Sequence, residues 1–480
     1  MSEWKESELV QIGNIVSGGT PSTSNSKYWN GDILFVTPND LSKNETAYIE
    51  KTERKISKEG LLNSSANLLP VGSIVISSRA PIGYFAIASK ELTTNQGCKS
   101  IIPKSDFDSL FLYYCFNHYV ERIKRLGAGS TFAEISKGDL ETVKFPHPTL
   151  KVEQRRIARI LSTADAVIEK TQAAIAKYKA IKQGMLHDLF TRGIDTSTAC
   201  PPDRRGKLRP KYQDAPHLYK QSKLGWIPKE WEVFRLEETT YYVDYRGKTP
   251  PKSDFGVYLV TARNIKDGYI DYEVSKEYIR EDAFESAMSR GKAKIGDVLI
   301  TTEAPLGNVA QIDKENIALA QRVIKYQGFE NKLKNDFLGR FLMSDIFQRQ
   351  LYANATGSTV LGIKGSRLHR LFICVPKPKE QESIVKRLIS IEDKIQTEQN
   401  YLHKLQQIKA GLMADLLSGK KSLNLDLKGL KDYHDLESSN QANQKNHGSD
   451  NIGLEDGHNL ESSNQANQKN HGSDNIGSDK

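Results

Sequence analysis

Two stretches of the chain decide its fold, and each has the pattern of one long amphipathic helix. The first runs from Glu153 to Gly193 as EQRRIARILSTADAVIEKTQAAIAKYKAIKQGMLHDLFTRG, and the second from Glu380 to Lys420 as EQESIVKRLISIEDKIQTEQNYLHKLQQIKAGLMADLLSGK. Apolar residues recur in both at alternating steps of four and three residues, the spacing of a coiled-coil seam. At ~1.5 Å per residue, each helix would be about 50–60 Å long.

The two apolar seams share one register. Every seam residue of the first stretch has a counterpart 227 positions later, as Ile157 has in Ile384, and even the polar interruption at Lys182 returns at Lys409. This agreement indicates an internal duplication, and we expect the two seams to bury each other rather than to pack as unrelated helices on separate cores. The central seam residues are Ile157, Leu161, Ile168 and Ile175 in the first stretch and Ile384, Leu388, Ile395 and Leu402 in the second.

Length and composition limit the class of protein. The 480 residues suffice for two to four domains, and no run approaches the ~20 apolar residues of a membrane span. The amino-terminal MSEWKESELV carries acidic residues and lacks an apolar core, so we expect no signal peptide, no membrane association and a cytoplasmic location. The cysteines lack paired spacing, which predicts free thiols and no zinc site; they are Cys98, Cys115, Cys200 and Cys374.

Charge is unevenly distributed along the chain. The segment 421–480 contains six Lys and ten Asp or Glu, a net charge of −4. Because the whole chain has a net charge of +9, residues 1–420 carry +13. A basic body indicates a polyanionic partner. The tail itself repeats eighteen residues, 436–453 and 460–477, and is rich in Ser, Asn, Gln and Gly. We expect it to be disordered, because it has little to bury.

The segments outside the helices also repeat. Short β-rich runs punctuated by turns fill the first 150 residues, with one helical pattern at 107–126 that Asp106 could cap. The stretch 70–83 returns as 294–307, and 107–126 has its counterpart at 336–352. We therefore divide the chain into a first α/β globule (1–150), a first rod helix (151–193), a polar connector (194–230), a second globule (231–378), a second rod helix (379–420) and the tail (421–480).

The order globule, helix, globule, helix predicts an α+β fold of two similar mixed α/β domains separated by a long antiparallel two-helix coiled coil. Antiparallel pairing places the globules at opposite ends and relates the two halves by a pseudo-two-fold axis. Parallel pairing would bring both globules to one end and leave the rod without a purpose.

Motifs for chemistry are missing from the sequence. There is no phosphate-binding Gly-x-x-x-x-Gly-Lys-Ser/Thr loop, no glycine-rich turn after a strand, and no Asn/Asp-Pro-Pro-Tyr/Phe stretch of the kind that amino-methyltransferases use. Histidines are few and scattered. We therefore predict a non-catalytic chain with no catalytic, cofactor-binding or metal-binding residues of its own.

Polar and cationic loops on both globules are the best candidates for binding. Their hydroxyl, amide and cationic groups suit contacts with phosphates, and Arg, Asn and Gln can form paired hydrogen bonds with guanine or adenine edges. The candidate DNA-binding residues are Thr20, Ser22, Thr23, Arg79, Asn95, Gln96, Ser130 and Lys137 in the first globule, and Arg246, Lys248, Thr249, Arg263, Asn264, Gln321, Arg322, Ser358 and Lys364 in the second.

The chain resembles the specificity subunit of a Type I restriction–modification system. The likeness lies in Gly18-Gly19-Thr20-Pro21-Ser22, 28–33 (Tyr-Trp-Asn-Gly-Asp-Ile) and 37–41 (Thr-Pro-Asn-Asp-Leu) of the first half. In the second half it lies in 246–251 (Arg-Gly-Lys-Thr-Pro-Pro), 261–265 (Thr-Ala-Arg-Asn-Ile) and 411–419 (Gly-Leu-Met-Ala-Asp-Leu-Leu-Ser-Gly). It covers about residues 3–420 and leaves out the tail.

The resemblance implies two target recognition domains that each read one half of a split site in double-stranded DNA. It also implies two methyltransferase subunits that carry S-adenosylmethionine and methylate adenine at N6, together with restriction subunits that use ATP and Mg²⁺. The rod would hold the half-sites about one turn (~34 Å) apart. Each specified base pair contributes ~1–3 kcal/mol of discrimination, whereas a useful site needs ~4–10 kcal/mol, so two readers achieve what one small domain does not.

Two other classes of function stay open from the residues alone. A self-contained nuclease with an unrecognised site would cut or modify DNA without partners. A coiled-coil adaptor would bind no nucleic acid, or bind it without the salt dependence of phosphate contacts.

Overall fold

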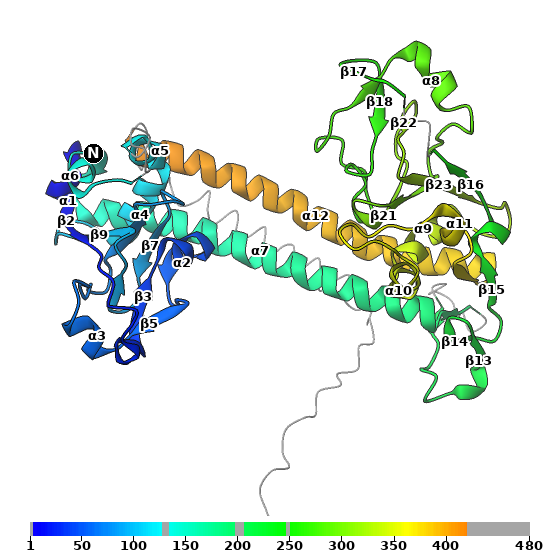
Figure 1. Ribbon diagram of the computed structural model, residues 1–480, viewed down its shortest axis with the longest axis horizontal. Coiled ribbons are helices and arrows are strands. Elements are labelled where there is room, and N and C mark those ends of the chain that lie inside the picture. The colour runs from blue at the N-terminus through cyan, green and yellow to red at the C-terminus, as the bar shows by residue number, and fades with distance from the viewer. Residues whose placement is uncertain (1–2, 127–133, 197–205, 246–249, 420–480) are drawn as a thin grey trace, which may run out of the picture.

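Two α/β globules lie at opposite ends of a long antiparallel helix pair in the computed structural model, which describes residues 3–126, 134–196, 206–245 and 250–419 (Figure 1). The pair consists of α7 (Lys151–Thr191) and α12 (Pro378–Leu417), of 41 and 40 residues. The predicted fold class is confirmed. The tail expected to be disordered and Cys200 fall outside the described residues, whereas Cys98, Cys115 and Cys374 are free and buried.

The first globule contains β1 (Trp4–Glu8), α1 (Leu9–Ile12), β2 (Gly13–Ser17), η1 (Ser26–Tyr28), β3 (Trp29–Val36), α2 (Pro38–Lys43), β4 (Tyr48–Ile49), β5 (Arg54–Ile56), α3 (Lys58–Leu62), β6 (Ile74–Ser77), β7 (Phe85–Ala88), β8 (Leu92–Thr94), β9 (Cys98–Pro103), α4 (Ser109–His118), α5 (Val120–Lys124), α6 (Lys137–Glu141) and β10 (Lys144–Pro148). Its sheets have the strand orders β2-β9-β6-β7-β4 and β5-β3-β8, and β1 pairs with β10.

The connector and the second globule contain β11 (Ile194–Asp195), β12 (Lys207–Leu208), η3 (Pro216–Leu218), β13 (Tyr219–Ser222), β14 (Gly225–Pro228), β15 (Glu232–Arg235), η4 (Leu236–Glu238), β16 (Thr240–Asp244), β17 (Lys252–Ser253), β18 (Val257–Val260), β19 (Tyr278–Ile279), α8 (Glu281–Ala287), β20 (Val298–Thr302), β21 (Leu306–Gln311), β22 (Ala318–Leu319), β23 (Val323–Gly328), α9 (Asn335–Met343), α10 (Asp345–Ala353), α11 (Gly365–Leu368) and β24 (Phe372–Val375). Its sheets have the orders β16-β23-β20-β21 and β17-β19-β18-β22, and β15 pairs with β24.

The second globule repeats the topology of the first. Strands β16, β23, β20 and β21 follow the order of β2, β9, β6 and β7, and the parallel pair β18–β22 corresponds to the parallel pair β3–β8. The polar connector is more structured than its composition suggests, since β13 and β14 form an antiparallel hairpin within it.

The helical pattern predicted at 107–126 is two helices. It begins at Ser109, with Asp108 rather than Asp106 as the capping residue, because the Asp108 carboxylate accepts a hydrogen bond from the Phe111 amide at 3.0 Å. Tyr119 then separates α4 from α5. Its counterpart is interrupted in the same way, where Ser344 ends α9 and caps α10.

The seam of the helix pair is buried, as the register predicts. Near the middle of the rod, Ile175 and Leu405 are 7% and 8% exposed, while Ile168 and Leu402 are half-buried. Toward the ends, both helices enter the globular cores: Ile157 and Leu161 share the first core with Leu416, and Leu186 shares the second with Ile384. The two stripes therefore contact each other and also fasten the globules.

Two residues after the end of each rod helix stands a glycine that packs against a tryptophan from the start of a globule. Gly193 and Gly419 have φ of 64° and 69°, the left-handed region that favours glycine at helix ends. A Cβ on Gly193 would lie 2.5 Å from the ring of Trp231, and a Cβ on Gly419 would lie 2.8 Å from Trp4. The two tryptophans are 227 positions apart, so the amino terminus meets the end of α12 as the second globule meets the end of α7.

A buried glutamine fastens the first turn of each rod helix to its globule. Gln154 accepts a hydrogen bond from the Asp108 amide at 2.9 Å and donates to the Pro148 carbonyl at 3.0 Å. Gln381, also 227 positions later, accepts from the Lys334 amide at 2.9 Å and donates to the Pro376 carbonyl at 2.8 Å. The two side chains therefore make the same junction twice.

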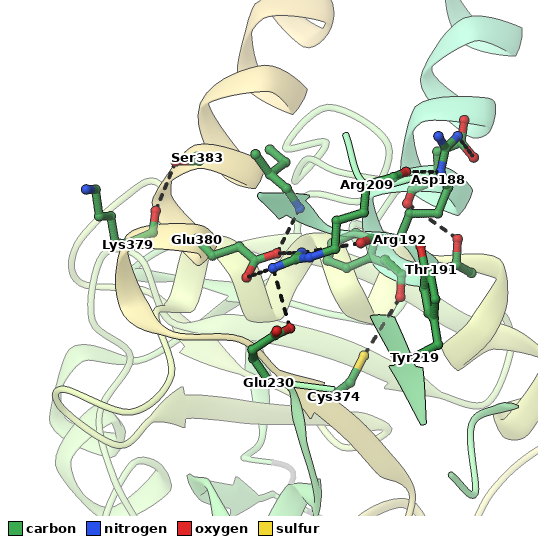
Figure 2. A network of polar contacts seen from close by, with 12 residues as sticks. Asp188, Thr191, Arg192, Arg209, Tyr219, Glu230, Cys374, Lys379, Glu380 and Ser383 are labelled. Atoms are coloured by element: carbon green, nitrogen blue, oxygen red, sulfur yellow. Dashed lines mark hydrogen bonds and ion pairs between the residues drawn. The ribbon is translucent and has the colours of Figure 1, made fainter. Parts of the chain in front are cut away.

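The connector adds a buried ion pair at the second junction. Figure 2 shows Arg209 between Glu380 and Glu230, beside the end of α7 and the start of α12. Its guanidinium donates to Glu380 at 2.5 Å, and the side chains are 11% and 5% exposed. The same carboxylate accepts from the Ile194 amide at 2.8 Å. This network holds the connector between the two helices of the rod.

Candidate nucleic-acid interface

One edge of the first globule gathers most of its predicted binding residues. The strands β2, β8 and β6 end at this edge and β9 begins there. Backbone hydrogen bonds connect the loops that follow: the Gly19 amide donates to Thr94 at 2.9 Å, and the Ser78 amide donates to Gly97 at 2.9 Å. Thr20 also donates to Gln96 through its hydroxyl. These hydrogen bonds therefore bring together on one surface Thr20, Asn95, Gln96 and Arg79.

The arginine of this edge, Arg79, is already paired with a carboxylate. Arg79 forms a salt bridge with Glu134 at 2.9 Å, and the two side chains are 46% and 36% exposed. The hydrogen bond from Arg79 holds the pKa of Glu134 below its ordinary value, so the carboxylate is charged at neutral pH. The Ile135 amide donates to the Ser78 carbonyl at 2.9 Å, which brings α6 and Lys137 to the same edge.

The second globule builds the corresponding edge. Its parallel strands β18 and β22 end side by side there, and the Ala320 amide just after β22 donates to the Val260 carbonyl at the end of β18 at 2.9 Å. Arg263 and Gln321 follow these two strands. The Thr302 amide donates to the Arg322 carbonyl at 2.9 Å, as Ser78 does to Gly97 in the first globule. The matching bonds identify this edge as the counterpart of the first.

Arg322 is held in an unusual conformation. Its φ is 71°, in the left-handed region that residues other than glycine rarely adopt. The guanidinium lies 3.3 Å from Glu303, and the side chains are 48% and 40% exposed. Glu303 occupies the position of Arg79, so the ion pair of the second edge has its charges in the opposite order along the chain.

Asn264 must be withdrawn as a DNA contact. It is fully buried, and its side chain accepts from the Thr261 amide at 2.9 Å and donates to Asp271 and Ser275 carbonyls, both at 2.9 Å. Asp40 makes the same capping contact in the first globule, accepting from the Thr37 amide at 2.9 Å. Both side chains fold the turn after a parallel strand, which explains why this position is polar.

The same alignment of turns reveals a residue that the sequence reasoning missed. Asn39 precedes Asp40 as Arg263 precedes Asn264, and both Asn39 and Arg263 are exposed. The side-chain amide of Asn39 donates a hydrogen bond to the Glu53 carboxylate at 3.2 Å. Overlaying 37–41 on 261–265 in the sequence would have paired Asn39 with Arg263 and indicated it as a candidate.

The remaining candidates are placed as follows. Thr20 and Asn95 are half-buried; the exposed ones are Ser22, Thr23, Arg79, Gln96, Lys137, Arg263, Gln321, Arg322, Ser358 and Lys364. Ser130, Arg246, Lys248 and Thr249 lie outside the described residues. Within the described ranges, no group of His, Cys, Asp or Glu is arranged to hold a metal ion, and no helix is both long and apolar enough to cross a membrane.

Comparison with known proteins gives a consistent result. Residues 1–177 and 228–409 match the Type I restriction modification DNA specificity domain. The type I restriction enzyme MjaIX specificity subunit of Methanocaldococcus jannaschii is 37% identical over 237 residues, 49% of this chain and 51% of that one, so this alignment spans about half of either. The MjaVIII specificity subunit of the same organism is 28% identical over 87% of this chain and 94% of its own.

A solved structure shares the fold at low sequence identity. It comes from work on complex assembly and conformational transition of the type I R-M system, and its chain superposes with a TM-score of 0.51 at 14% identity. The likeness covers 86% of this chain and 97% of that chain. The arrangement of two globules on a helix pair is therefore found in a chain of very different sequence.

Proposed function

The chain belongs to the family of Type I restriction–modification DNA specificity proteins, and from this premise we propose that it is the DNA-reading subunit of such a system. Each globule is a target recognition domain that binds one half of a bipartite site in double-stranded DNA. The observation that carries the proposal is the pair of equivalent polar edges, one on each globule, held at opposite ends of a rod of defined length.

The chemistry of the two edges suits base reading. Asn39 and Gln96 in the first domain, and Arg263 and Gln321 in the second, are side chains that can form paired hydrogen bonds with base edges. Thr20, Ser22 and Lys364 are suited to phosphates. Because counterparts at these positions differ, as Asn39 and Arg263 do, the two half-sites differ in sequence.

The reactions belong to other chains in this proposal. Two methyltransferase subunits, which use S-adenosylmethionine, methylate adenine at N6 in the site that this chain selects. Restriction subunits that use ATP and Mg²⁺ join them in the cytoplasm. The role of this chain is to position the two methyltransferase subunits on one duplex, at a separation that the rod sets.

Methylated-base sequencing tests this function. The full chain is co-expressed with its methyltransferase partner in a host that lacks adenine methylation, and the genome is sequenced for N6-methyladenine. We expect one motif of two short specified halves separated by unspecified bases, and no methylation when either chain is omitted. A continuous motif, or methylation by this chain alone, would contradict the proposal.

A further inference from the structure

Each globule meets the helical rod at a polar cluster of three side chains. In the first cluster, the Asp165 carboxylate of α7 pairs with Lys409 of α12 and accepts a hydrogen bond of 2.6 Å from the Tyr114 hydroxyl of α4. Asp165 therefore contacts the other helix and the first globule at once. Its side chain and that of Lys409 are 27% and 28% exposed, so the contact is largely shielded from water.

The second cluster repeats this arrangement with the helices exchanged. The Glu392 carboxylate of α12 pairs with Lys182 of α7 at 3.1 Å and with Arg340 of α9 at 2.6 Å. The side chains of Lys182, Glu392 and Arg340 are 15%, 23% and 11% exposed. The lysines that interrupt the apolar seam in the sequence are thus the cations of two matched interhelical pairs.

The two clusters are counterparts in the duplicated chain. Asp165 and Glu392 are 227 positions apart, as are Lys182 and Lys409, and the globular members Tyr114 and Arg340 are 226 apart. In both halves, the two rod helices and the globule meet at one carboxylate. A chance contact would not be expected to recur at equivalent positions. The rod retains this junction at each end.

The contacts of the clusters are directional, unlike the packing around them. Apolar packing of the globules on the helix ends resists separation, but its free energy depends on the buried area rather than on the direction of single contacts. A hydrogen bond to a charged group has a preferred distance and angle. The second cluster also borders a groove of about 920 Å³ whose lining includes residues of α7, α9 and α12.

We propose that these two clusters are positioning elements that fix the orientation of each recognition domain on the rod, and so restrict the DNA spacer that the protein accepts. The inference depends on the proposed function, since it concerns how the two half-sites are held in phase. Rod length sets the distance between the domains, and the clusters set the angle at which each domain presents its polar edge.

The two clusters differ in one respect that sharpens the test. The Tyr114 hydroxyl can donate or accept a hydrogen bond, whereas the Arg340 guanidinium only donates and is always charged. Exchanging the charges of the first pair, Asp165→Lys with Lys409→Asp, therefore keeps every contact possible. The equivalent exchange in the second, Lys182→Glu with Glu392→Lys, places a cation against Arg340.

The experiment measures spacer discrimination in the complete complex. Co-expressed variants are assayed by methylated-base sequencing on a plasmid library. Its members carry both half-sites with the native spacer or with one base pair more or fewer, or carry one altered half-site with the native spacer. Asp165→Asn and Glu392→Gln disrupt one cluster each. Glu169→Gln and Asp393→Asn remove a charge from exposed positions nearby on the same two helices and serve as controls.

We expect Asp165→Asn and Glu392→Gln to reduce the preference for the native spacer at least several-fold, while altered half-sites stay unmethylated and the controls match the wild type. The charge exchange restores the preference in the first cluster and not in the second. Unchanged spacer preference in the single variants, or equal outcomes of the two exchanges, would overturn the inference. A wild-type complex without a bipartite motif would instead refute the proposed function.

A variant that lowers all methylation is resolved by the exchange within the same cluster. If Asp165→Asn abolishes methylation and the exchanged pair restores both methylation and native-spacer preference, the cluster positions the domain. If the exchanged pair restores methylation but accepts every spacer alike, the cluster serves stability only, and the inference is wrong.

Discussion

Gln154 and Gln381 occupy equivalent buried places in the two halves of the molecule, whereas Arg79 and Glu303, also counterparts, carry opposite charges. The first comparison concerns the rod and its junctions, where the buried glutamines and the interhelical carboxylates keep equivalent contacts 227 positions apart. The second concerns the outer edges, where the backbone hydrogen bonds persist but the exposed side chains differ. The molecule therefore repeats its scaffold and varies its reading surfaces.

The largest difference between the halves is expected at the first turn of the rod helices. Glu380→Ala leaves Arg209 buried without its main carboxylate, and breaking a buried ion pair costs about 3–5 kcal/mol. Glu153, its counterpart, is only half-buried, so Glu153→Ala should cost clearly less. Thermal unfolding of the purified full chain compares them, and equal losses of stability would show that the connector contributes nothing specific to the second junction.

Substitutions at matched edge positions should each affect one half-site. Arg263→Ala removes a candidate base contact from the second domain and should weaken selection at one or two positions of one half of the motif, by about 1–3 kcal/mol or roughly 5- to 150-fold. Asn39→Ala should do the same in the other half. Methylation of a library of single-base site variants measures both, and changes in both halves from one substitution would argue against independent readers.

Removing the carboxylates of the edge ion pairs should have the smallest effect. Glu134→Gln and Glu303→Gln free Arg79 and Arg322 for phosphates, which should raise affinity for non-specific duplex several-fold and increase the salt slope of binding by about 1. Arg122, which is not a candidate contact, pairs with Glu6 at 2.9 Å, so Glu6→Gln provides a control for a general change of charge. Fluorescence anisotropy at several salt concentrations is the measurement, and unchanged slopes would mean that these arginines do not meet DNA.

The fold was accessible from the sequence because duplication left its mark in the register. A heptad seam that recurs with a constant shift of 227 residues predicts two paired helices. The order of segments along the chain then places the globules at opposite ends of the pair. The helix break at Tyr119 was not predicted, because α4 and its continuation share apolar periodicity. Nor did the sequence indicate that Lys182 pairs with Glu392 and Lys409 with Asp165 across the rod, since antiparallel partners are distant in the chain.

The sequence indicated polar loops beside strand ends as candidates, but not how these loops are arranged in space. The structure brings several of them to one edge of each globule, because neighbouring strands end there. Asn264 was misjudged since a polar residue after a strand serves equally as a cap or as a contact, and only burial distinguishes the two. Asn39 was overlooked although its counterpart Arg263 was chosen. Comparing the two halves position by position pairs Asn39 with Arg263, whereas the role of Asn264 follows only from its burial.

Lengthening the rod tests the central claim most directly. Repeating residues 167–173 after Ala173 and residues 394–400 after Asn400 adds one heptad to each helix at equivalent places and preserves the seam. Both helices become about 10 Å longer, at ~1.5 Å per residue, which corresponds to about three base pairs at ~3.4 Å each. Methylated-base sequencing of the complex should report the same two half-sites with a spacer longer by that amount; an unchanged spacer with normal methylation would contradict the rod as the ruler.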